Sequence, residues 1–471
     1  MNGVVARFAP SPTGYLHVGG IRTALINYIL IKQSKIKFPN SKLLLRIEDT
    51  DHDRSKDKYK LSILNGLDWL GIKFDKKPII QSHNIEKHKK IAFELLKKGF
   101  AFKCSCTEED LDQRRVESKN EGLDTRRLCA QCENDPKIQQ LEKDYCIRIK
   151  IPNEGIISFD DQIQGKLTID NKEINNFVLI RKNGFPTYML SVVVDDHEML
   201  VNYIIRGNDH TTNTFKQIYL YKYLDWELPK YAHLPLIHGI DGSKLSKRHG
   251  AVDINQFKVL GYLPHSIINN LILLGWSPKR ENEIIELEEI IKIFDLKQMS
   301  KSASIFDHKR LNFFNNYFLS KKNNDRYFHE FIDENQKLKN FYNEDNQKLK
   351  KIFDIHKSSI NYYSELEDIA KVYFDKSFKL ISNNKIKNDF QNILKKFIQH
   401  FDNIEKWEKE EIELIIKEFI KNNKIKFSSF GKPIRYILTN SLNGPSISDI
   451  FYVLGKENTF LRLNNYINNL K

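Results

Sequence analysis

The pattern of apolar and polar positions predicts a mixed α/β part followed by a helical part. Residues 4–8 start with a short apolar run, prolines and a glycine in residues 10–14 exclude regular structure, and apolar residues recur at helical spacing across residues 21–29. This order predicts a strand, a rigid turn and a helix. Residues 43–47 and 203–205 predict further inner strands, each followed by charged side chains.

The middle and the end of the chain predict other elements. Residues 85–99 have an amphipathic helical pattern, and residues 145–151 alternate like a strand. Residues 177–181 and 185–194 flank Lys182-Asn-Gly184, which predicts a hairpin. From about Asn323 the pattern is helical. The aromatic residues of this helical part are expected in its core: Phe328, Tyr362, Tyr363, Phe374 and Trp407.

Composition adds size, charge and location. A chain of 471 residues is long enough for about three domains. Lys and Arg number 75 against 61 Asp and Glu, so the formal charge is +14, which suits a polyanionic partner, although a surplus that serves solubility gives the same balance. The chain contains no run of 18 apolar residues, and its first motif begins at Arg7. We therefore expect a soluble, cytoplasmic protein without a membrane segment.

The N-terminal turn indicates phosphate binding. A strand that leads through a rigid turn into a helix brings backbone N–H groups and a helix N-terminus to one point. His17 adds a donor there, and Gly19 and Gly20 let a ligand approach the backbone closely. A surface loop whose glycines serve only the turn has the same local sequence.

A second stretch far downstream supports the same chemistry. Lys244 and Lys247 lie in a glycine-bounded loop at residues 241–250, where two lysines can hold a polyphosphate as point charges. A solvated basic turn is the alternative for this stretch taken alone.

Charged residues after the predicted strands indicate the substrate. Arg7 and Arg206 each lie at the end of a predicted inner strand, and guanidinium groups pair bidentately with carboxylates, so the two arginines fit a dicarboxylic substrate. Glu48 also ends a strand, where the ligand crevice of a parallel sheet lies. For Asp51 and Asp53 we expect an acidic helix cap.

Six stretches together carry a family resemblance. The turn and the lysine loop resemble the HIGH and KMSKS motifs of class I aminoacyl-tRNA synthetases, in the same order. The chain is similar to bacterial-type glutamyl-tRNA synthetases over roughly its first 280 residues. The similar stretches are residues 7–14 (RFAPSPTG), 45–51 (LRIEDTD), 186–188 (PTY), 193–197 (VVDDH), 205–210 (IRGNDH) and 244–248 (KLSKR).

The resemblance implies a fold and a domain order. We expect an α/β protein with a Rossmann-like parallel-sheet catalytic domain, an inserted α+β domain that holds the acceptor end of tRNA, and an all-α C-terminal anticodon-binding region. The expected boundaries are 1–88 and 189–240 for the catalytic halves, 89–188 for the insertion, 241–322 for a stem-contact domain with the KLSKR loop, and 323–471 for the anticodon-binding domain.

The resemblance also implies residue roles, and three side chains would act in catalysis: His17 on the α-phosphate, and Lys244 and Lys247 on the leaving pyrophosphate. The residues implied to bind glutamate are Arg7, Ser11, Glu48, Tyr188 and Arg206. The residues implied to bind ATP are Thr13, His17, Gly19, Gly20, Asp209, Lys244 and Lys247.

The cysteines predict a metal site. Cys104, Cys106, Cys129 and Cys132 form a Cys-x-Cys and a Cys-x-x-Cys pair, while Cys146 lies apart in the sequence. In a reducing cytosol such pairs ligate metal more often than they form disulfides. The resemblance points the same way, because some glutamyl-tRNA synthetases carry zinc here. We therefore expect one structural Zn²⁺; the alternative is four free thiols.

The implied activity is the ATP-dependent ligation of L-glutamate to tRNA(Glu) through a glutamyl-adenylate, with Mg²⁺ and with a monomeric enzyme. Charging of tRNA(Gln) as well is left open. A nucleotidyltransferase can share the His-x-Gly turn, but needs neither the insertion nor the long helical C-terminus. A non-catalytic tRNA-binding protein is the third alternative.

Overall fold

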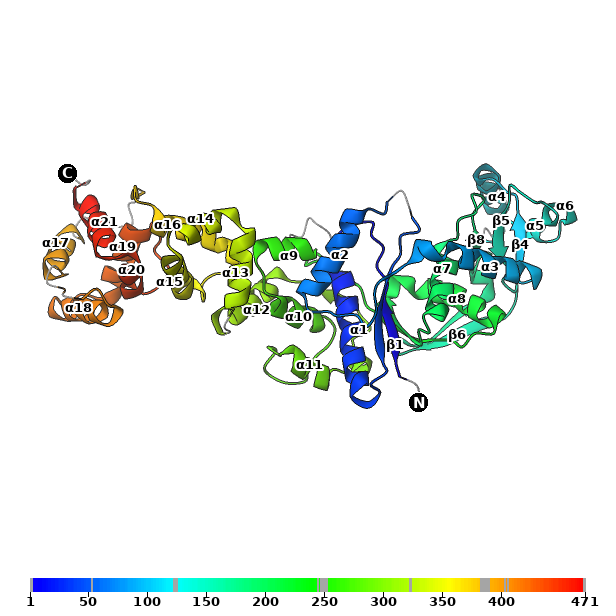
Figure 1. Cartoon of the computed structure of the whole chain (residues 1–471), viewed down its shortest axis with the longest axis horizontal. Helices are drawn as coiled ribbons and strands as arrows, with labels where there is room; N and C mark the ends of the chain where they lie inside the picture. The colour runs from blue at the N-terminus through cyan, green and yellow to red at the C-terminus, as the bar shows by residue number, and fades with distance from the viewer. Residues whose placement is uncertain are drawn as a thin grey trace. The chain divides into compact units, whose positions relative to one another are not determined.

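The structure is a computed structural model that describes residues 3–51, 54–121, 126–243, 245, 253–321, 324–381, 390–401, 404 and 406–468. The chain divides into two compact units, Met1–Phe257 with Ile267–His308, and Lys258–Ser266 with Lys309–Lys471. The strands of the described residues all lie in the first unit. The expected α/β class with a helical C-terminal region is thereby confirmed (Figure 1).

The first unit is built on a seven-stranded sheet in the order β3-β2-β1-β9-β10-β6-β7. The pairs from β3 to β6 are parallel, and only β6 and β7 are antiparallel. The strands are β1 (Val5–Phe8), β2 (Lys42–Ile47), β3 (Ile79–Ile80), β6 (Ile156–Asp161), β7 (Gly165–Asp170), β9 (Tyr203–Gly207) and β10 (Lys230–Leu234). The sheet confirms the strands predicted at residues 43–47 and 203–205.

Helices cover both faces of this sheet. Figure 1 shows α1 on one side of β1, and α7 and α8 on the other. The buried stripe of α1 includes Ile21, Leu25 and Ile29, the apolar positions whose helical spacing predicted it. Outside the inserted part of the chain, the helices of this unit up to β10 are α1 (Val18–Lys37), α2 (Asp57–Trp69), α3 (Ile85–Lys97), α7 (Tyr188–Glu198) and α8 (Thr211–Leu224).

A second, three-stranded antiparallel sheet lies in the inserted part of the chain. Its order is β4-β5-β8, and one longer and two short helices accompany it among the described residues. The elements are β4 (Ala101–Cys104), α4 (Glu108–Asn120), α5 (Ala130–Glu133), α6 (Pro136–Gln139), β5 (Cys146–Ile149) and β8 (Val178–Ile180). β6 and β7 come from the same stretch of sequence but extend the main sheet instead, through the pairing of β6 with β10.

The hairpin predicted at residues 177–194 is wrong in its second half. β8 and the turn form as expected, and Ile180 bridges to Pro186, but the chain then enters α7 at Tyr188. The run from Leu190 to Val194 is buried on all sides, so its apolar residues have no alternation, and a continuous apolar run does not distinguish a buried strand from a buried helix.

The remaining elements of the first unit follow β10. They are β11 (Ile237–His238), α9 (Ile254–Leu260), α10 (Pro264–Ile272), α11 (Leu287–Ile293) and β12 (Ser304–Ile305). The end of α9 and the start of α10 belong to the second unit. β11 and β12 pair in parallel.

The second unit is helical in its described residues. Its helices are α12 (His308–Lys321), α13 (Asp325–Glu334), α14 (Gln336–Glu344), α15 (Asn346–His356), α16 (Leu366–Phe374), α17 (Phe390–Phe401), α18 (Lys409–Asn422), α19 (Phe427–Thr439), α20 (Ile447–Leu454) and α21 (Lys456–Asn468). Of the aromatic residues predicted in its core, Phe328, Tyr363 and Phe374 are buried, whereas Tyr362 and Trp407 are partly exposed. No helix of the described residues is long and apolar enough to cross a membrane.

Candidate functional site

A cavity of about 650 Å³ opens in the first unit. It lies beyond the carboxyl ends of β1, β2 and β9, where parallel α/β sheets bind their ligands. All ten described residues that the sequence singled out for glutamate or ATP line it: Arg7, Ser11, Thr13, His17, Gly19, Gly20, Glu48, Tyr188, Arg206 and Asp209. Lys244 and Lys247 lie outside the described residues, but Leu245 between them lines the same cavity.

The N-terminus of α1 forms one wall of this cavity. His17 is the N-cap of α1, so the first N–H groups of the helix follow directly after it. A side chain at Gly20 would lie 2.8 Å from Leu16 Cδ1, whereas a Cβ at Gly19 would meet no atom within 4 Å. A Cβ at Gly20 would thus require the end of the Leu16 side chain to shift, and Gly19 leaves open space in front of the helix terminus.

A chain of alternating charges forms the wall beside β1 and β2. Arg7 Nε donates to Asp196 Oδ1 at 3.0 Å, and Arg46 Nη1 donates to the same oxygen at 2.6 Å. Arg46 Nη2 then donates to Glu48 Oε1 at 2.9 Å. All four side chains are buried. Arg7 and Glu48 reach the cavity, while Arg46 and Asp196 hold them from behind.

The buried charges shift the pKa values of the two carboxyl groups in opposite directions. Burial raises the pKa of Glu48, and its ion pair with Arg46 does not fully offset this effect. Burial acts on Asp196 in the same way, but Arg46 and Arg7 outweigh it and lower the pKa of Asp196. Asp196 is thus the anion that both arginines share.

The wall beside β9 holds Arg206 with uncharged acceptors. Arg206 Nη2 donates to Thr214 Oγ1 at 2.6 Å and to Gln217 Oε1 at 2.8 Å, and Arg206 Nε lies 3.3 Å from His233 Nε2. Arg206 Nη1 is buried and has no hydrogen-bond partner among the described residues. Because Arg206 lines the cavity, this free N–H edge is available to a ligand.

Tyr188 stands at the first turn of α7 and contacts His210. Its hydroxyl lies 3.2 Å from His210 Nδ1. Burial, with a smaller contribution from the positive charge of Arg206, lowers the pKa of His210 to about 4. His210 is therefore neutral at physiological pH.

Several supporting residues were missed from the sequence. Arg46 and Asp196 stand inside two stretches that carried the resemblance, but no role was assigned to them. Asp195 accepts hydrogen bonds from Gln81 (2.9 Å), Asn84 (2.9 Å) and His88 (2.8 Å). It thereby joins the short 3₁₀ helix η1 (Gln81–Asn84) and α3 to α7. A buried carboxylate has to be paired, so the adjacent Asp195 and Asp196 after a buried apolar run were the available signal.

The acidic cap expected at Asp51 has a different form. Asp51 accepts hydrogen bonds from the backbone N–H and from the Nε of Arg54, at 3.2 and 2.7 Å, and so closes a turn before α2. The N-cap of α2 is Lys56. Asp53 lies outside the described residues.

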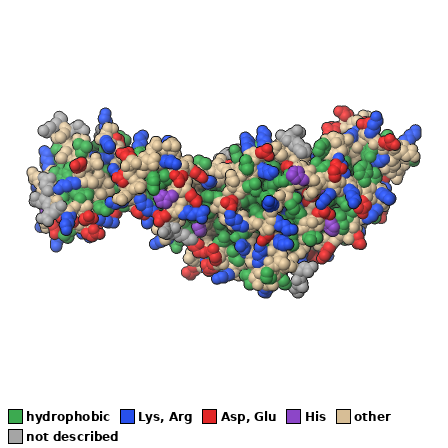
Figure 2. Space-filling model, viewed as in Figure 1, with side chains coloured by type: hydrophobic (Ala, Val, Ile, Leu, Met, Phe, Trp, Pro, Cys, Tyr) green, Lys and Arg blue, Asp and Glu red, His purple; other side chains and the backbone are tan. Residues whose placement is uncertain are grey.

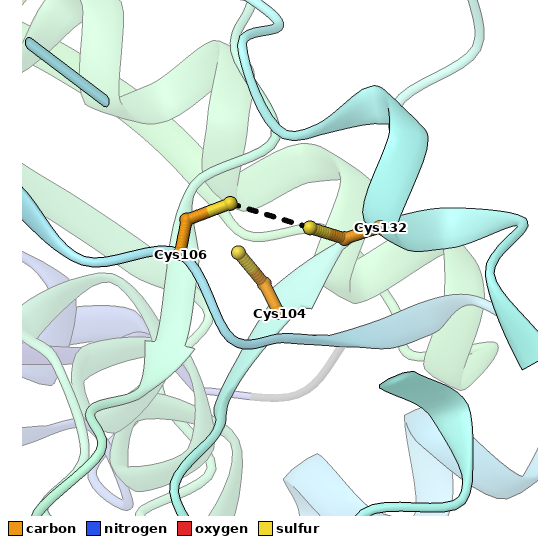
Figure 3. A group of neighbouring side chains, drawn as sticks. All are labelled: Cys104, Cys106 and Cys132. Atoms are coloured by element: carbon orange, nitrogen blue, oxygen red, sulfur yellow. Dashed lines mark hydrogen bonds between the residues drawn. The ribbon is translucent and has the colours of Figure 1, made fainter. Parts of the chain in front are cut away.

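The cysteines gather in the inserted part of the chain. The Sγ atoms of Cys104, Cys106 and Cys132 lie within 4.8 Å of one another, and those of Cys106 and Cys132 are 3.3 Å apart (Figure 3). All five cysteines are buried. Cys146, which lies apart in the sequence, stands opposite Cys104 in the β4–β5 ladder and joins the cluster. Strand pairing, which the spacing of cysteines does not report, brings it there.

The cluster has the chemistry of a thiolate metal site. Contacts with the thiols of Cys129 and Cys146 lower the pKa of Cys104, and the same contacts raise the pKa values of Cys129 and Cys146. Arg114 donates to Cys106 Sγ at 3.2 Å, and Arg148 interacts with Cys104. Soft thiolates with nearby compensating cations fit Zn²⁺.

A second cavity, of about 350 Å³, lies in the helical unit beside α16 and the turn before α20. Its lining includes Tyr373, Asn443 and Pro445. Arg435 shapes the turn, because its Nε donates to Pro445 O and its Nη1 to Leu442 O, both at 3.0 Å. Lys and Arg side chains are spread among acidic ones over the face seen in Figure 2.

Comparisons with known proteins agree with this geometry. The family described as tRNA synthetases class I (E and Q), catalytic domain, matches residues 3–313. The chain belongs to this family. An anticodon binding domain family matches residues 327–467.

Relatives resemble the chain over its whole length. Glutamate--tRNA ligase 1 of Orientia tsutsugamushi is 38% identical over 98% of this chain and 97% of its own. Glutamate--tRNA ligase 2 of Wolbachia pipientis is 37% identical over 98% of this chain and 99% of its own. A crystal structure of a glutamate tRNA ligase from Elizabethkingia meningosepticum, in complex with its amino acid, superposes with a TM-score of 0.84 at 29% identity and covers 100% of both chains.

Proposed function

We propose that this protein is a glutamate–tRNA ligase, which joins L-glutamate to the 3′ end of tRNA(Glu) at the expense of ATP. The observation that carries the proposal is the cavity in which two buried arginines, Arg7 and Arg206, meet the N-terminus of α1. The arginines suit a dicarboxylic amino acid, and the helix N-terminus suits a phosphate. The full-length similarity to glutamate–tRNA ligases supports this assignment over a nucleotidyltransferase or a non-catalytic tRNA-binding protein.

In the first step the α-carboxylate of glutamate attacks the α-phosphate of ATP, which forms glutamyl-adenylate and releases pyrophosphate. Positioning and charge carry out this step, without a protein nucleophile. His17, with the first N–H groups of α1, binds the α-phosphate, and Lys244 and Lys247 bind the departing pyrophosphate. Mg²⁺ bound together with ATP would neutralise part of the negative charge of the phosphates.

In the second step a ribose hydroxyl of the terminal tRNA adenosine attacks the acyl carbon, and AMP leaves. The ribose and base of ATP lie near Thr13, Gly19, Gly20 and Asp209 in this proposal.

The apolar cavity beside Arg435 in the helical unit supports the proposal that an unstacked anticodon base binds there, because proteins read single-stranded RNA by splaying bases into pockets.

Glutamate is recognised at its three charged groups. Glu48 pairs with the amino group, Ser11 and Tyr188 bind beside it, and Arg7 and Arg206 bind carboxylate oxygens. Glutamine would present an amide donor to a guanidinium that has only donors. A site that leaves buried polar groups unpaired discriminates by roughly 10⁴ to 10⁵.

Pyrophosphate exchange tests the activity. The purified enzyme, given ATP, glutamate and tRNA, should exchange pyrophosphate into ATP, and we expect this exchange to need tRNA. Lys247→Ala should slow exchange by roughly 10² to 10³ with little change in glutamate KM, since the lysine acts as pyrophosphate separates. Lys230→Ala, an exposed lysine on β10, is the control. An exchange rate for Lys247→Ala close to that of the control would contradict the role of Lys247.

The tRNA partner is tested with purified tRNA(Glu) and tRNA(Gln). We propose that the enzyme is a cytoplasmic monomer that charges tRNA(Glu). Measurable glutamylation of tRNA(Gln) would identify a non-discriminating enzyme instead.

If the basic surplus contacts tRNA, the log of the Kd for tRNA should rise with the log of the salt concentration, with a slope of roughly 0.7 to 0.9 per neutralised phosphate.

We propose one structural Zn²⁺ held by Cys104, Cys106, Cys129 and Cys132. Zinc held by these thiolates would supply a structural crosslink and no catalysis. Zinc content of protein purified without chelator is the readout, with Cys129→Ser and Cys146→Ser as a matched pair. Loss of zinc from Cys129→Ser alone supports the proposal, and loss from Cys146→Ser alone makes Cys146 the fourth ligand. A zinc content near zero in the unmodified protein would contradict the proposed zinc site.

A further inference from the structure

Behind Arg206, out of the cavity, lies a buried acid–imidazole pair. Asp161, at the end of β6, and His233, on β10, are both buried, and Asp161 Oδ2 lies 2.7 Å from His233 Nδ1. His233 Nε2 in turn lies 3.3 Å from Arg206 Nε and 2.9 Å from Thr214 Oγ1. Asp161, His233 and Arg206 therefore form a continuous line of contacts from β6, across β10, to β9.

The hydrogen bonds of Asp161 favour its ionised form. Its Oδ1 accepts from the backbone N–H of Ile163 (2.9 Å) and Gln164 (2.8 Å), and its Oδ2 accepts from that of His233 (3.0 Å). Burial alone would raise the pKa of Asp161, but these bonds and the imidazole outweigh burial, and its pKa is lowered. All three backbone N–H groups donate to this carboxylate, as they do most strongly when it is ionised.

An ionised Asp161 fixes the tautomer of His233. A carboxylate accepts only, so the imidazole proton must stand on Nδ1, and Nε2 must carry a lone pair. Burial, together with the charge of Arg206, outweighs the attraction of Asp161 and lowers the pKa of His233, which keeps the ring neutral. Nε2 is therefore an acceptor at the place where Arg206 Nε donates.

The acceptor determines which edge of Arg206 faces the ligand. Nε is directed to His233, and Nη2 to Thr214 and Gln217, so Nη1 is left without a partner among the described residues. With the other tautomer, an N–H of His233 would face an N–H of Arg206. The guanidinium would then turn, and a misplacement of about 1 Å in a binding group can cost roughly 10²-fold in rate.

We propose that Asp161 and His233 are positioning residues that orient Arg206 and so determine the selectivity of the cavity for a carboxylate over an amide. This inference rests on the proposed function, in which Arg206 binds a carboxylate of glutamate. A purely structural role is the alternative, because the same pair joins β6 to β10.

Asp161→Asn is the first test. The substitution keeps the shape but places an amide N–H opposite His233 Nδ1, which forces the imidazole proton onto Nε2. We expect glutamate KM to rise by about 10- to 100-fold, ATP KM to change less than about twofold, and the preference for glutamate over glutamine to fall by a similar factor. A purely structural role would instead lower the active fraction and leave both KM values unchanged.

A pair of variants at His233 keeps the test decisive where Asp161→Asn does not fold. His233→Gln can place a carbonyl oxygen near the Nε2 position and keep the acceptor for Arg206, whereas His233→Asn can keep only the donor to Asp161. We expect the glutamate KM of His233→Gln to stay within about threefold of the wild-type value. The glutamate KM of His233→Asn should rise by about tenfold or more. The reverse order, or equal values, would overturn the inference.

The experiments distinguish a failure of the positioning role of Asp161 and His233 from a failure of the proposed ligase function. If the unmodified enzyme lacks glutamate-dependent pyrophosphate exchange in the presence of tRNA, the proposed function fails. If that enzyme is active and a folded Asp161→Asn variant has wild-type glutamate KM and selectivity, only the positioning role fails. Thermal unfolding of each variant verifies that it is folded.

Discussion

The two walls of the cavity hold their arginines in opposite ways. Arg7, on β1, pairs with the carboxylate of Asp196, which it shares with Arg46. Arg206, on the neighbouring strand β9, is held by a hydroxyl, an amide oxygen and an imidazole nitrogen, none of which carries charge. Both side chains are buried to a similar extent, with 4% and 5% of their surface exposed.

This difference shows where the positive field of the cavity comes from. A guanidinium next to a carboxylate has most of its charge compensated before any ligand arrives, whereas one that is held by neutral dipoles keeps its charge. The β1 side is therefore suited to hold residues in place, and the β9 side to attract an anion. Four experiments test this contrast.

The largest effect should follow removal of the uncompensated charge. Arg206→Ala should lower kcat/KM for glutamate by roughly 150- to 5,000-fold, since breaking a buried ion pair costs about 3–5 kcal/mol. Arg7→Ala should lower it less and destabilise the fold more, because Asp196 loses a partner. Steady-state exchange kinetics and thermal unfolding measure both quantities. Equal losses of kcat/KM in the two variants would contradict the proposed difference between Arg7 and Arg206.

The next effect concerns stability on the β1 side. Asp196→Asn leaves Arg7 and Arg46 without their shared anion and should cost about 3–5 kcal/mol in unfolding free energy at pH 7. The pKa of Asp196 is lowered in the folded protein, so its contribution is complete above the ordinary value of 3.8 and is lost as pH falls through the lowered pKa. Denaturant unfolding should show that the difference in unfolding free energy between Asp196→Asn and the unmodified protein is smaller at about pH 3 than at pH 7. Asp68→Asn, at an exposed ion pair, should change the unfolding free energy little at either pH.

The two walls can be made alike by one isosteric change. Gln217→Glu places a carboxylate where an amide oxygen now accepts from Arg206 Nη2 at 2.8 Å. Repulsion of a ligand carboxylate about 6 Å away at an effective dielectric constant of about 20 is about 2–3 kcal/mol, so glutamate KM should rise by roughly 30- to 150-fold. Gln217→Leu, which adds no charge, should have a smaller effect. If both variants have the same KM, charge is not what distinguishes the walls.

The smallest effect is a pH dependence from Glu48. Burial raises its pKa, and the amino group of glutamate needs its ionised form. Glutamate KM should therefore rise as pH falls through this raised pKa, by about tenfold per pH unit below it. Glu48→Gln should have a higher KM that no longer depends on pH in this range. A wild-type KM that stays constant down to pH 4.5 would contradict this role.

The local sequence determined much of the cavity, because its parts are short and regular. The strand, rigid turn and helix at residues 5–37 follow from prolines, glycines and apolar spacing that act within a few residues. Arg7, Glu48 and Arg206 follow predicted strands, and the carboxyl ends of parallel strands meet at one edge of a sheet. Their convergence on one cavity could thus be expected from local patterns and the resemblance together.

Only the tertiary structure decided which groups hold these side chains. Asp161 and His233 are 72 residues apart, and Arg7 and Asp196 are 189 apart. Pairing at such separations depends on strand order and register, and no local pattern encodes these. The same holds for Cys146, which the β4–β5 ladder brings to Cys104, and for the buried run that forms α7 rather than a strand. Local steric and apolar preferences act over one turn or one strand. A buried charged group, in contrast, must be paired, and its partner can lie far away in the sequence.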